Sequence, residues 1–466
     1  MGRFLRYWLR MVPVVLKGDR AYYGWVMCLA VFIALGGWSY YHHVTEGLIV
    51  TNMSDQVSWG IGIANFVYFV GVAAAAAILV VPAYIYKRQD IKHVVLFGEL
   101  MAVVAVIMCL LFICSDIGHP ERMWHLFPPF GMMNLPSSLL AWDVLVFSGY
   151  LTLNIYIPGY LLYMEYLKRE PRKLLYVPLV LVSIVWAVSI HTVTAFLLSG
   201  LGSRPFWNSA ILAPRFLISA GASGPAILYI VFTVIRTRTA FKIEDSVLEY
   251  LKTVLRITMP VNLFLLGCEV FLEFYTGSLH AVNAKYLYFG LHGHTMLPKF
   301  IWTAIVLNVS ATVLYLWKKT RANHRAMLVA CGLTITGVWL EKGMGLIFPG
   351  FTPSPLGEIV EYAPNLGEIA VCLGVLALGM LMFTVFVKVT IAIQTGELVV
   401  SYRDMPWLTG GAAIEASLRA QKQFEEELRR RKQVRRKRRE RPKLPQVRVK
   451  PVRRGEVRPP RSIFDR

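Results

Sequence analysis

Charged side chains are scarce in this chain of 466 residues. Lys, Arg, Asp and Glu make up 17% of it, hydrophobic residues make up 56%, and the mean hydropathy is +0.52. A soluble protein of this size needs charged residues to cover its surface, so the composition excludes one. The chain is therefore predicted to be an integral membrane protein.

Paired cysteines and the common catalytic motifs are also missing. The six cysteines lie apart within apolar stretches and form no C-x-x-C pair, so we interpret them as packing residues rather than a disulfide or metal framework. No Walker loop, G-x-G-x-x-G, H-E-x-x-H or nucleophile elbow occurs in a supporting context. The L-H-G-H motif at 291–294 has no companion ligands, and a bound metal ion is not expected.

Long apolar runs are what the sequence has in abundance. A membrane-crossing helix needs roughly 20 apolar residues. Ten runs meet this length, and the first carries no cleavage site, so it is expected to stay as a helix. The fold predicted is all-α, and the runs are 24–43, 60–86, 93–114, 138–166, 175–200, 209–236, 254–275, 296–317, 326–348 and 365–393.

Basic residues alternate between the connections, which predicts the orientation. Short loops rich in Lys and Arg stay in the cytoplasm, and here such loops precede the first run and follow the second, fourth, sixth and eighth. Both termini are therefore predicted to be cytoplasmic, in the inner membrane of a prokaryote. Residues 1–23 form a cytoplasmic segment, 24–393 the transmembrane domain and 394–466 a basic, partly disordered cytoplasmic tail.

The net charge of +21 does not indicate nucleic-acid binding, because it is concentrated in that tail. Residues 397–466 hold 21 Lys and Arg against 9 Asp and Glu, which gives +12. The basic run at 429–443 could bind anionic lipid headgroups or a cytoplasmic partner. The interpretation that we favour is a solvated segment that reinforces the orientation.

The stretch 114–143 joins two apolar runs and places a carboxylate at each end, Asp116 and Asp143. An ionisable group inside a membrane span indicates a functional site, because burial there is costly. Arg122 could bind a ligand or simply form an ion pair with Asp116. His42 and His43 end the first run, where one of them could exchange protons or both could belong to an interfacial Tyr/His belt.

Other polar groups lie deeper. His191 is the one histidine well inside a run, which argues against a haem held by two facing histidines. Asn262, Glu269 and Glu273 share one helix face within about 40°, and close carboxylates can share a proton. Glu341 lies at a similar depth, beside Lys342. These groups gather in the outer half of the membrane, which suits a lipid-soluble quinol better than a channel lined throughout its depth.

The residues DIGHPER (116–122), LLAWD (139–143), SIHTV (189–193) and EKGMGLIFPGFTPSPLGEIVEY (341–362) resemble the polysulfide reductase membrane subunits, the NrfD/PsrC family. Among its branches, the chain most resembles DsrP, of the sulfite-reductase-associated complex. The resemblance implies two four-helix bundles with flanking helices, no haem, and a quinone near the outer face beside a periplasmic iron–sulfur subunit. It assigns that site to His42 or His43, Asp116 and His191, although His119 stands where many relatives have arginine.

The sequence therefore predicts a quinone-reactive subunit of a respiratory complex, with menaquinone as exchangeable substrate and with further membrane and cytoplasmic subunits as partners. His42 or His43 and Asp116 would exchange protons with the quinone, Arg122 and Asp143 would help to bind it, and Glu269, Glu273 and Glu341 would relay protons. A proton or solute transporter without redox chemistry, or a structural membrane anchor, are the alternatives.

Overall fold

The computed structural model describes residues 3–127, 129–239, 241–275, 277 and 280–400, and within these ranges the regular structure is helical, with no β-strand. The basic tail predicted for 394–466 lies almost entirely outside the described residues.

Nine helical segments in the described part are long and apolar enough to cross a membrane. They are α2 (Arg20–Thr45), the segment Ile61–Ile85, α6 (Val95–Asp116), α7 (Leu139–Tyr166), α8 (Lys173–Ser199), α9 (Leu212–Arg238), α10 (Asp245–Tyr275), α12 (Pro298–Leu316) and α16 (Leu366–Gln394). The segment Ile61–Ile85 consists of α3 (Ile61–Ala74), α4 (Ala77–Val80) and a π-helical turn, η2 (Val81–Ile85). The chain is thus a multi-pass membrane protein.

The tenth predicted span, 326–348, is not one α-helix. It is built from α14 (His324–Trp339), the π-helical turn η5 (Leu340–Met344) and α15 (Gly345–Phe351) in direct succession. Shorter helices cap the ends of the molecule: α1 (Arg3–Leu16), α5 (Gln89–Lys92), α11 (His280–Phe289) and α13 (Lys318–Ala322), with 3-10 turns η1 (Leu48–Val50), η3 (Pro120–Leu126) and η4 (Pro205–Trp207).

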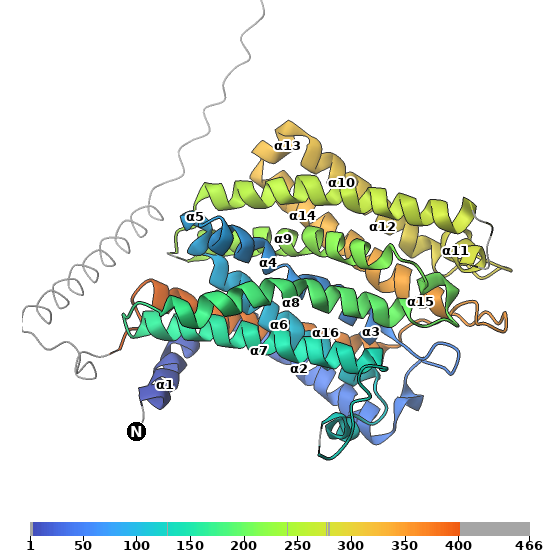
Figure 1. Ribbon diagram of the computed structural model, residues 1–466, viewed down its shortest axis with the longest axis horizontal. Helices are drawn as coiled ribbons and strands as arrows, with labels where there is room; N and C mark the ends of the chain where they lie inside the picture. The colour runs from blue at the N-terminus through green and yellow to red at the C-terminus, as the bar shows by residue number, and fades with distance from the viewer. Residues whose placement is uncertain (1–2, 128, 240, 276, 278–279, 401–466) are drawn as a thin grey trace, which may run out of the picture. The chain divides into compact units, whose positions relative to one another are not determined.

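The long helices form two four-helix bundles, as the family resemblance implied. In the first bundle α3, α6, α7 and α8 pack in a ring, and in the second α9, α10, α12 and α14 do the same (Figure 1). The bundles meet where α3 packs on α9 and η5, and where α8 packs on α9. The contact between α3 and α9 is close because small residues line it: a Cβ on Gly224 would overlap the Cβ of Ala75.

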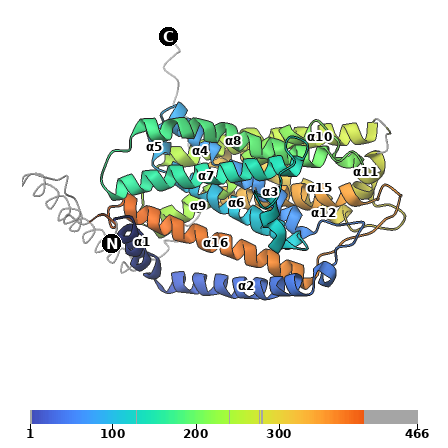
Figure 2. The same cartoon turned by 60° about the horizontal axis from the view of Figure 1, so that its bottom comes forward.

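The flanking helices α2 and α16 run side by side along one edge of the molecule (Figure 2). Gly36 and Gly374 bring their backbones together, since a Cβ on Gly36 would stand 2.7 Å from the Cα of Gly374. α16 also packs on α6, whereas most side chains of α2 face outward. α2 therefore forms the rim of the molecule.

We call the end that carries α1, α5 and α13 the basic end, because the connections 87–92, 168–173, 236–242 and 318–325 lie there. The other end, with the connections 46–60, 117–138, 200–211 and 352–365, is called the opposite end. Each long helix runs between these two ends.

Candidate functional site

Asp116 is the last residue of α6 and caps the first turn of α3. Its Oδ2 accepts the backbone N–H groups of Gly60 at 2.8 Å and Ile63 at 3.2 Å, while Ser115 donates its hydroxyl to Oδ1 at 3.1 Å. Helix α3 has no capping side chain of its own, so the carboxylate of the neighbouring helix satisfies its free N–H groups and complements its dipole. Gly62 provides the space for this carboxylate, because a Cβ at residue 62 would lie 2.2 Å from Asp116 Oδ1.

Glu368 approaches the same place from the start of α16. It forms a capping box with Asn365, accepting that residue's backbone N–H at 2.9 Å while its own N–H donates to the Asn365 side chain at 2.9 Å. Tyr362 donates its hydroxyl to Glu368 Oε1 at 2.5 Å and accepts the N–H of Ile61 at 3.0 Å. Burial, followed by the interaction with Glu368, raises the pKa of Tyr362 above its ordinary value, so its hydroxyl stays protonated.

The two adjacent histidines of α2 have different surroundings. His43 is 5% exposed, and its Nδ1 has no hydrogen-bond partner among the described residues. His42 is half-exposed and lies 2.5 Å from Glu46 Oε1. Of the two histidines that the sequence left open, His43 is the one that lines a cavity together with Asp116 and Glu368.

These groups surround a small cavity of about 10 Å³ at the opposite end of the molecule. We call it the far-end cavity, and it holds at most one water. Its walls come from α2, α3, α6, α16 and the 51–53 segment: His43, Thr51, Met53, Ile61, Gly62, Ser115, Asp116, Glu368, Val371 and Cys372. A basic ring nitrogen and two carboxyl groups can take up or give up protons there.

The other predicted site residues lie elsewhere. Asp143 accepts the hydroxyl of Thr194 at 2.8 Å inside the first bundle. Thr194 lies one helical turn from His191 on α8, and the buried Nε2 of His191 makes no hydrogen bond among the described residues. Neither lines the far-end cavity. Arg122 is exposed and stands 3.9 Å from Glu121, so it does not form the ion pair with Asp116 that the loop allowed.

The second bundle holds a buried charge cluster, to which α9, α10, α12 and the π-helical turn η5 contribute. Arg215 of α9 pairs with Glu269 of α10 and with Glu341 of η5, the latter at 2.9 Å. Asn308 of α12 and Asn262 of α10 donate to the second oxygen of Glu341 at 2.8 Å and 3.2 Å. We define the charge cluster as Arg215, Asn262, Glu269, Asn308, Glu341 and Lys342.

This arrangement corrects one expectation. Glu269 and Glu273 were expected to form a carboxylate pair, but Glu269 is neutralised by Arg215, and Glu273 Oε2 makes no hydrogen bond among the described residues. Glu273 borders the cluster across a second small cavity that Arg215, Glu269 and Tyr288 also line.

The π-helical turn explains how two successive residues reach this cluster. Glu341 and Lys342 are each 1% exposed, although neighbours on an α-helix point about 100° apart. The wider turn of η5 brings both inward, and Lys342 Nζ stands 3.6 Å from Glu341 Oε1. Such single π-turns occur frequently at functional sites.

Sequence reasoning missed several of these groups. Glu368 and Tyr362 were not selected, although N-x-x-E at 365–368 is a capping-box pattern. Glu99 on α6 was missed as well; it is 2% exposed and its Oε2 makes no hydrogen bond to any residue that the structure describes, so the basic half of the first bundle also holds a buried acid. Among the described residues, no group of three His, Cys, Asp or Glu side chains is placed to hold a metal ion.

Comparison with known proteins decides the family. The profile of the polysulphide reductase NrfD family matches residues 49–352, well over half of the chain. The chain belongs to the NrfD family. The family predicted from the four sequence motifs is thus confirmed, while the narrower likeness to DsrP stays a prediction.

Three relatives of this NrfD protein align over most of their length. A selenate reductase subunit of Mesobacillus selenatarsenatis is 23% identical over 397 residues, 77% of this chain and 91% of the relative. A putative dimethyl sulfoxide reductase membrane subunit of Halobacterium salinarum is 25% identical over 401 residues, 77% and 89%. The Hdr-like menaquinol oxidoreductase integral membrane subunit of Archaeoglobus fulgidus is 24% identical over 389 residues, 80% and 94%. Each is named as one subunit of a larger oxidoreductase.

Proposed function

We propose that this NrfD protein is the quinone-reactive membrane subunit of a respiratory complex and exchanges electrons between the menaquinone pool and an extrinsic iron–sulfur subunit. The observation that supports this most is His43, whose buried Nδ1 has no partner among the described residues and which lines the far-end cavity with Asp116 and Glu368. A quinol hydroxyl would supply the hydrogen-bond partner that this nitrogen does not have among the described residues.

The residues of the cavity suit proton exchange with a quinol, which gives up two electrons and two protons when oxidised. His43 accepts a hydrogen bond at Nδ1, and Asp116 accepts the second proton on a carboxylate that two backbone N–H groups and Ser115 already orient. Tyr362 donates to Glu368 and fixes that carboxylate at the cavity wall. The cavity is smaller than a quinone ring, so binding displaces lining side chains such as Met53 or Val371.

The electrons must leave through another subunit, because this chain offers no cysteine set for an iron–sulfur cluster. The 117–138 connection suits a docking partner at the opposite end, since Trp124, Phe127, Phe130 and Met132 are exposed on it. We place this end in the periplasm and both termini in the cytoplasm, following the basic connections.

The finer assignments follow the names of the relatives. One is a menaquinol oxidoreductase subunit and another is named for dimethyl sulfoxide, a sulfur compound. We therefore propose menaquinone as the exchangeable substrate and a role in sulfur-compound metabolism. His191, Glu269, Glu273 and Glu341 would store or relay protons away from the cavity.

The adjacent histidines provide a matched test. In complexes purified through a tag on this chain, we expect His43→Gln and Asp116→Asn to lower menaquinol oxidation by about a hundredfold, with assembly intact. His42→Gln should change it little, because His42 faces Glu46 outside the cavity.

Wild-type oxidation in both His43→Gln and Asp116→Asn would contradict the proposal and favour a structural anchor. Purified protein that binds no quinone but conducts ions in liposomes would instead indicate a transporter.

A further inference from the structure

The first bundle has a pocket of about 770 Å³ at its basic end, which we call the first-bundle pocket. Its walls come from η2, α5, the ends of α6, α7, α8 and α16 that lie there, and the connection from α9 to α10. A volume of this size is typical of a binding site for a small organic molecule.

The inner wall of this pocket is apolar and belongs to the membrane-spanning helices. Val95 of α6, Leu161 of α7 and Tyr176 of α8 line it, and Leu161 lies about 7.5 Å before the end of α7. The rim is formed by charged residues of the connections. A ligand that fills the pocket therefore needs an apolar part and a charged part, which a phospholipid has at the membrane boundary.

Three of the basic connections each contribute one lysine to the rim: Lys92, Lys168 and Lys242. All three are exposed, and none of their side chains forms a hydrogen bond or an ion pair within 4 Å with a residue that the structure describes. Ammonium groups without such a partner are available to a phosphate group. Basic pockets between membrane-spanning helices are typical binding sites for phospholipid headgroups.

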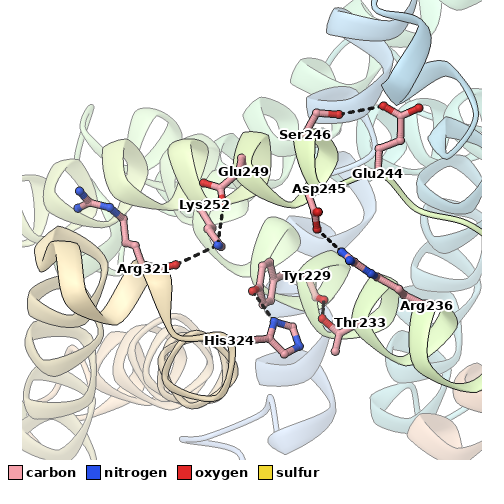
Figure 3. Close-up of polar contacts among 10 residues, drawn as sticks. All are labelled: Tyr229, Thr233, Arg236, Glu244, Asp245, Ser246, Glu249, Lys252, Arg321 and His324. Carbon is pink, nitrogen blue, oxygen red and sulfur yellow. Dashed lines mark hydrogen bonds and ion pairs between the residues drawn. The ribbon is translucent and has the colours of Figure 1, made fainter.

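A smaller pocket at the basic end of the second bundle has the opposite property. It measures about 350 Å³ and lies between α9, α10 and the α13–α14 corner. Its cations are paired: Arg236 with Asp245, and Lys252 with Glu249 at 2.7 Å and with the Arg321 carbonyl at 2.9 Å (Figure 3). Because these cations already have partners, the smaller pocket offers less to a phosphate group than the first-bundle pocket.

Lys168 has a backbone conformation that favours glycine. Its φ is +54°, and it closes a Schellman motif at the end of α7: its N–H donates to the Glu165 carbonyl at 3.0 Å, and the Arg169 N–H donates to the Met164 carbonyl at 3.0 Å. A side chain at such a position costs free energy, and strained residues of this kind cluster at ligand-binding sites. The strain at Lys168 thus coincides with a lysine on the rim of the pocket.

Four carboxyl groups also line the first-bundle pocket: Asp90, Glu165, Glu170 and Glu244. Asp90 is neutralised by Arg88, which donates to it at 2.5 Å, and Glu244 accepts the Ser246 hydroxyl at 3.4 Å (Figure 3). The pocket therefore carries charges of both signs. A purely anionic ligand would be attracted by the lysines and repelled by the remaining carboxylates.

The pocket also offers acceptors for a hydrogen-bond donor. Gln394 of α16 donates its Nε2 to the His93 carbonyl at 3.4 Å, whereas its buried Oε1 makes no hydrogen bond among the described residues. Glu165 interacts electrostatically with Lys168 on the same side of the pocket. A phosphate group alone would leave these acceptors without a donor, whereas a primary ammonium group can donate to them.

We propose that the first-bundle pocket binds the headgroup of phosphatidylethanolamine, a phospholipid with one phosphate and one primary ammonium group. The phosphate lies among Lys92, Lys168 and Lys242, and the ammonium donates to Gln394 Oε1 and Glu165. The acyl chains follow the apolar wall. The site is separate from the far-end cavity, so it does not depend on the proposed quinone reaction.

The test uses the full-length chain, purified in a mild detergent, freed of lipid and titrated with single phospholipids under native mass spectrometry. The wild-type chain should bind one phosphatidylethanolamine about tenfold more tightly than phosphatidylcholine, whose trimethylammonium group has no N–H to donate. Free phosphoethanolamine should compete poorly, because it has no acyl chains to cover the apolar wall.

Lys168→Gly separates ligand binding from folding. Glycine suits the positive φ, so this variant should melt no lower than the wild type, yet it should bind phosphatidylethanolamine about tenfold more weakly because one ammonium group is lost. Lys87→Gly is the matched control. Lys87 also has a φ of +54° but does not line the pocket, so its replacement should leave the lipid affinity unchanged.

Wild-type lipid affinity in Lys168→Gly, or equal binding of phosphatidylethanolamine and phosphatidylcholine, would overturn the proposal. Equal competition by free phosphoethanolamine would assign the pocket to a soluble ligand and overturn the lipid assignment. Cross-linking of Lys242 to another subunit in the purified complex, with no phospholipid retained, would assign the pocket to a protein partner and overturn it as well.

Discussion

Arg215 holds two acids in a place where neither would be stable alone. Its guanidinium reaches Glu269 and Glu341 from α9, and its side chain is 4% exposed. Buried ion pairs add little compared with apolar packing, but removing one partner leaves an uncompensated charge. The stability of the second bundle should therefore depend strongly on this single residue.

Arg215→Met keeps much of the side-chain volume and removes the charge. We expect it to lower the free energy of unfolding by about 3–5 kcal/mol, measured as reduced thermal stability in detergent. Arg236→Met is the control, because Arg236 pairs with Asp245 at the surface, where such pairs are worth about 1 kcal/mol or less. Equal losses of stability in the two variants would show that the buried ion pair contributes no more to stability than the surface pair.

Single residues were also where the sequence was least decisive. His42 and His43 are adjacent, and only the rotation of α2 against α16 determines which of them reaches Asp116. Glu368 lies 252 positions from Asp116 in the chain, so no local pattern could join them. The sequence alone predicted the depth of Asp116 in the membrane, whereas the partners of Asp116 depend on tertiary packing.

The side chain of Asp116, at the end of α6, caps the N-terminus of α3. This arrangement requires a glycine at residue 62. We expect Gly62→Ala to push the Asp116 carboxylate away from Gly60 and Ile63, since the new Cβ would overlap its Oδ1. A displacement of about 1 Å can cost about a hundredfold in rate, and menaquinol oxidation is the measurement.

The control for this change is Gly332→Ala on α14, where an added Cβ meets no atom within 4 Å. It should leave oxidation unchanged and slightly favour the helix. Normal oxidation in Gly62→Ala would mean that the position of Asp116 does not matter.

The 352–365 connection is fastened by Glu361, which accepts hydrogen bonds from Tyr286 at 3.1 Å and from the Met296 N–H at 3.0 Å. Burial alone would raise the pKa of Glu361, but these bonds and His294 hold it below its ordinary value of 4.5. A lowered pKa stabilises the fold above pH 4.5, and this stabilisation is lost as the pH falls through the lower folded value.

We therefore expect hydrogen exchange in 353–361, corrected for its intrinsic pH dependence, to speed up as the pH falls below 4.5. Glu361→Gln should exchange fast at every pH, whereas Glu358→Gln, on the exposed part of the same connection, should keep the wild-type profile. A wild-type hydrogen-exchange profile in Glu361→Gln would show that Glu361 does not hold the 352–365 connection in place.

The helices themselves followed from the sequence because long apolar runs are constrained by bilayer thickness. The runs 60–86 and 326–348 were exceptions: their hydropathy is continuous, yet the π-helical turns η2 (Val81–Ile85) and η5 (Leu340–Met344) interrupt the α-helix. The second of these, η5, carries charged residues. The π-turn is stabilised by the partners of Glu341 and Lys342 on three other helices, which no local pattern encodes. The same packing explains why Glu269 forms an ion pair with Arg215 and does not form a carboxylate pair with Glu273.

The orientation of the whole protein decides which compartment the far-end cavity faces. A cysteine placed in the 117–138 connection should react with a membrane-impermeant thiol reagent in intact cells, because that connection is predicted to be periplasmic. A cysteine in 429–443 should react only after lysis. The reverse labelling pattern would show that the protein has the opposite orientation in the membrane. The extrinsic partner would then lie in the cytoplasm.

The position of α2 at the rim has a consequence for enzyme kinetics. The far-end cavity lies between α2, which packs chiefly on α16, and the core of the first bundle. Under the proposed function, we expect quinol to enter this cavity past α2 from the lipid and not from the aqueous phase. For such an enzyme the effective substrate concentration is the mole fraction of quinol in the lipid. Adding empty lipid at constant total quinol should then slow turnover, as dilution does for a soluble enzyme, while enlarging the aqueous volume should not.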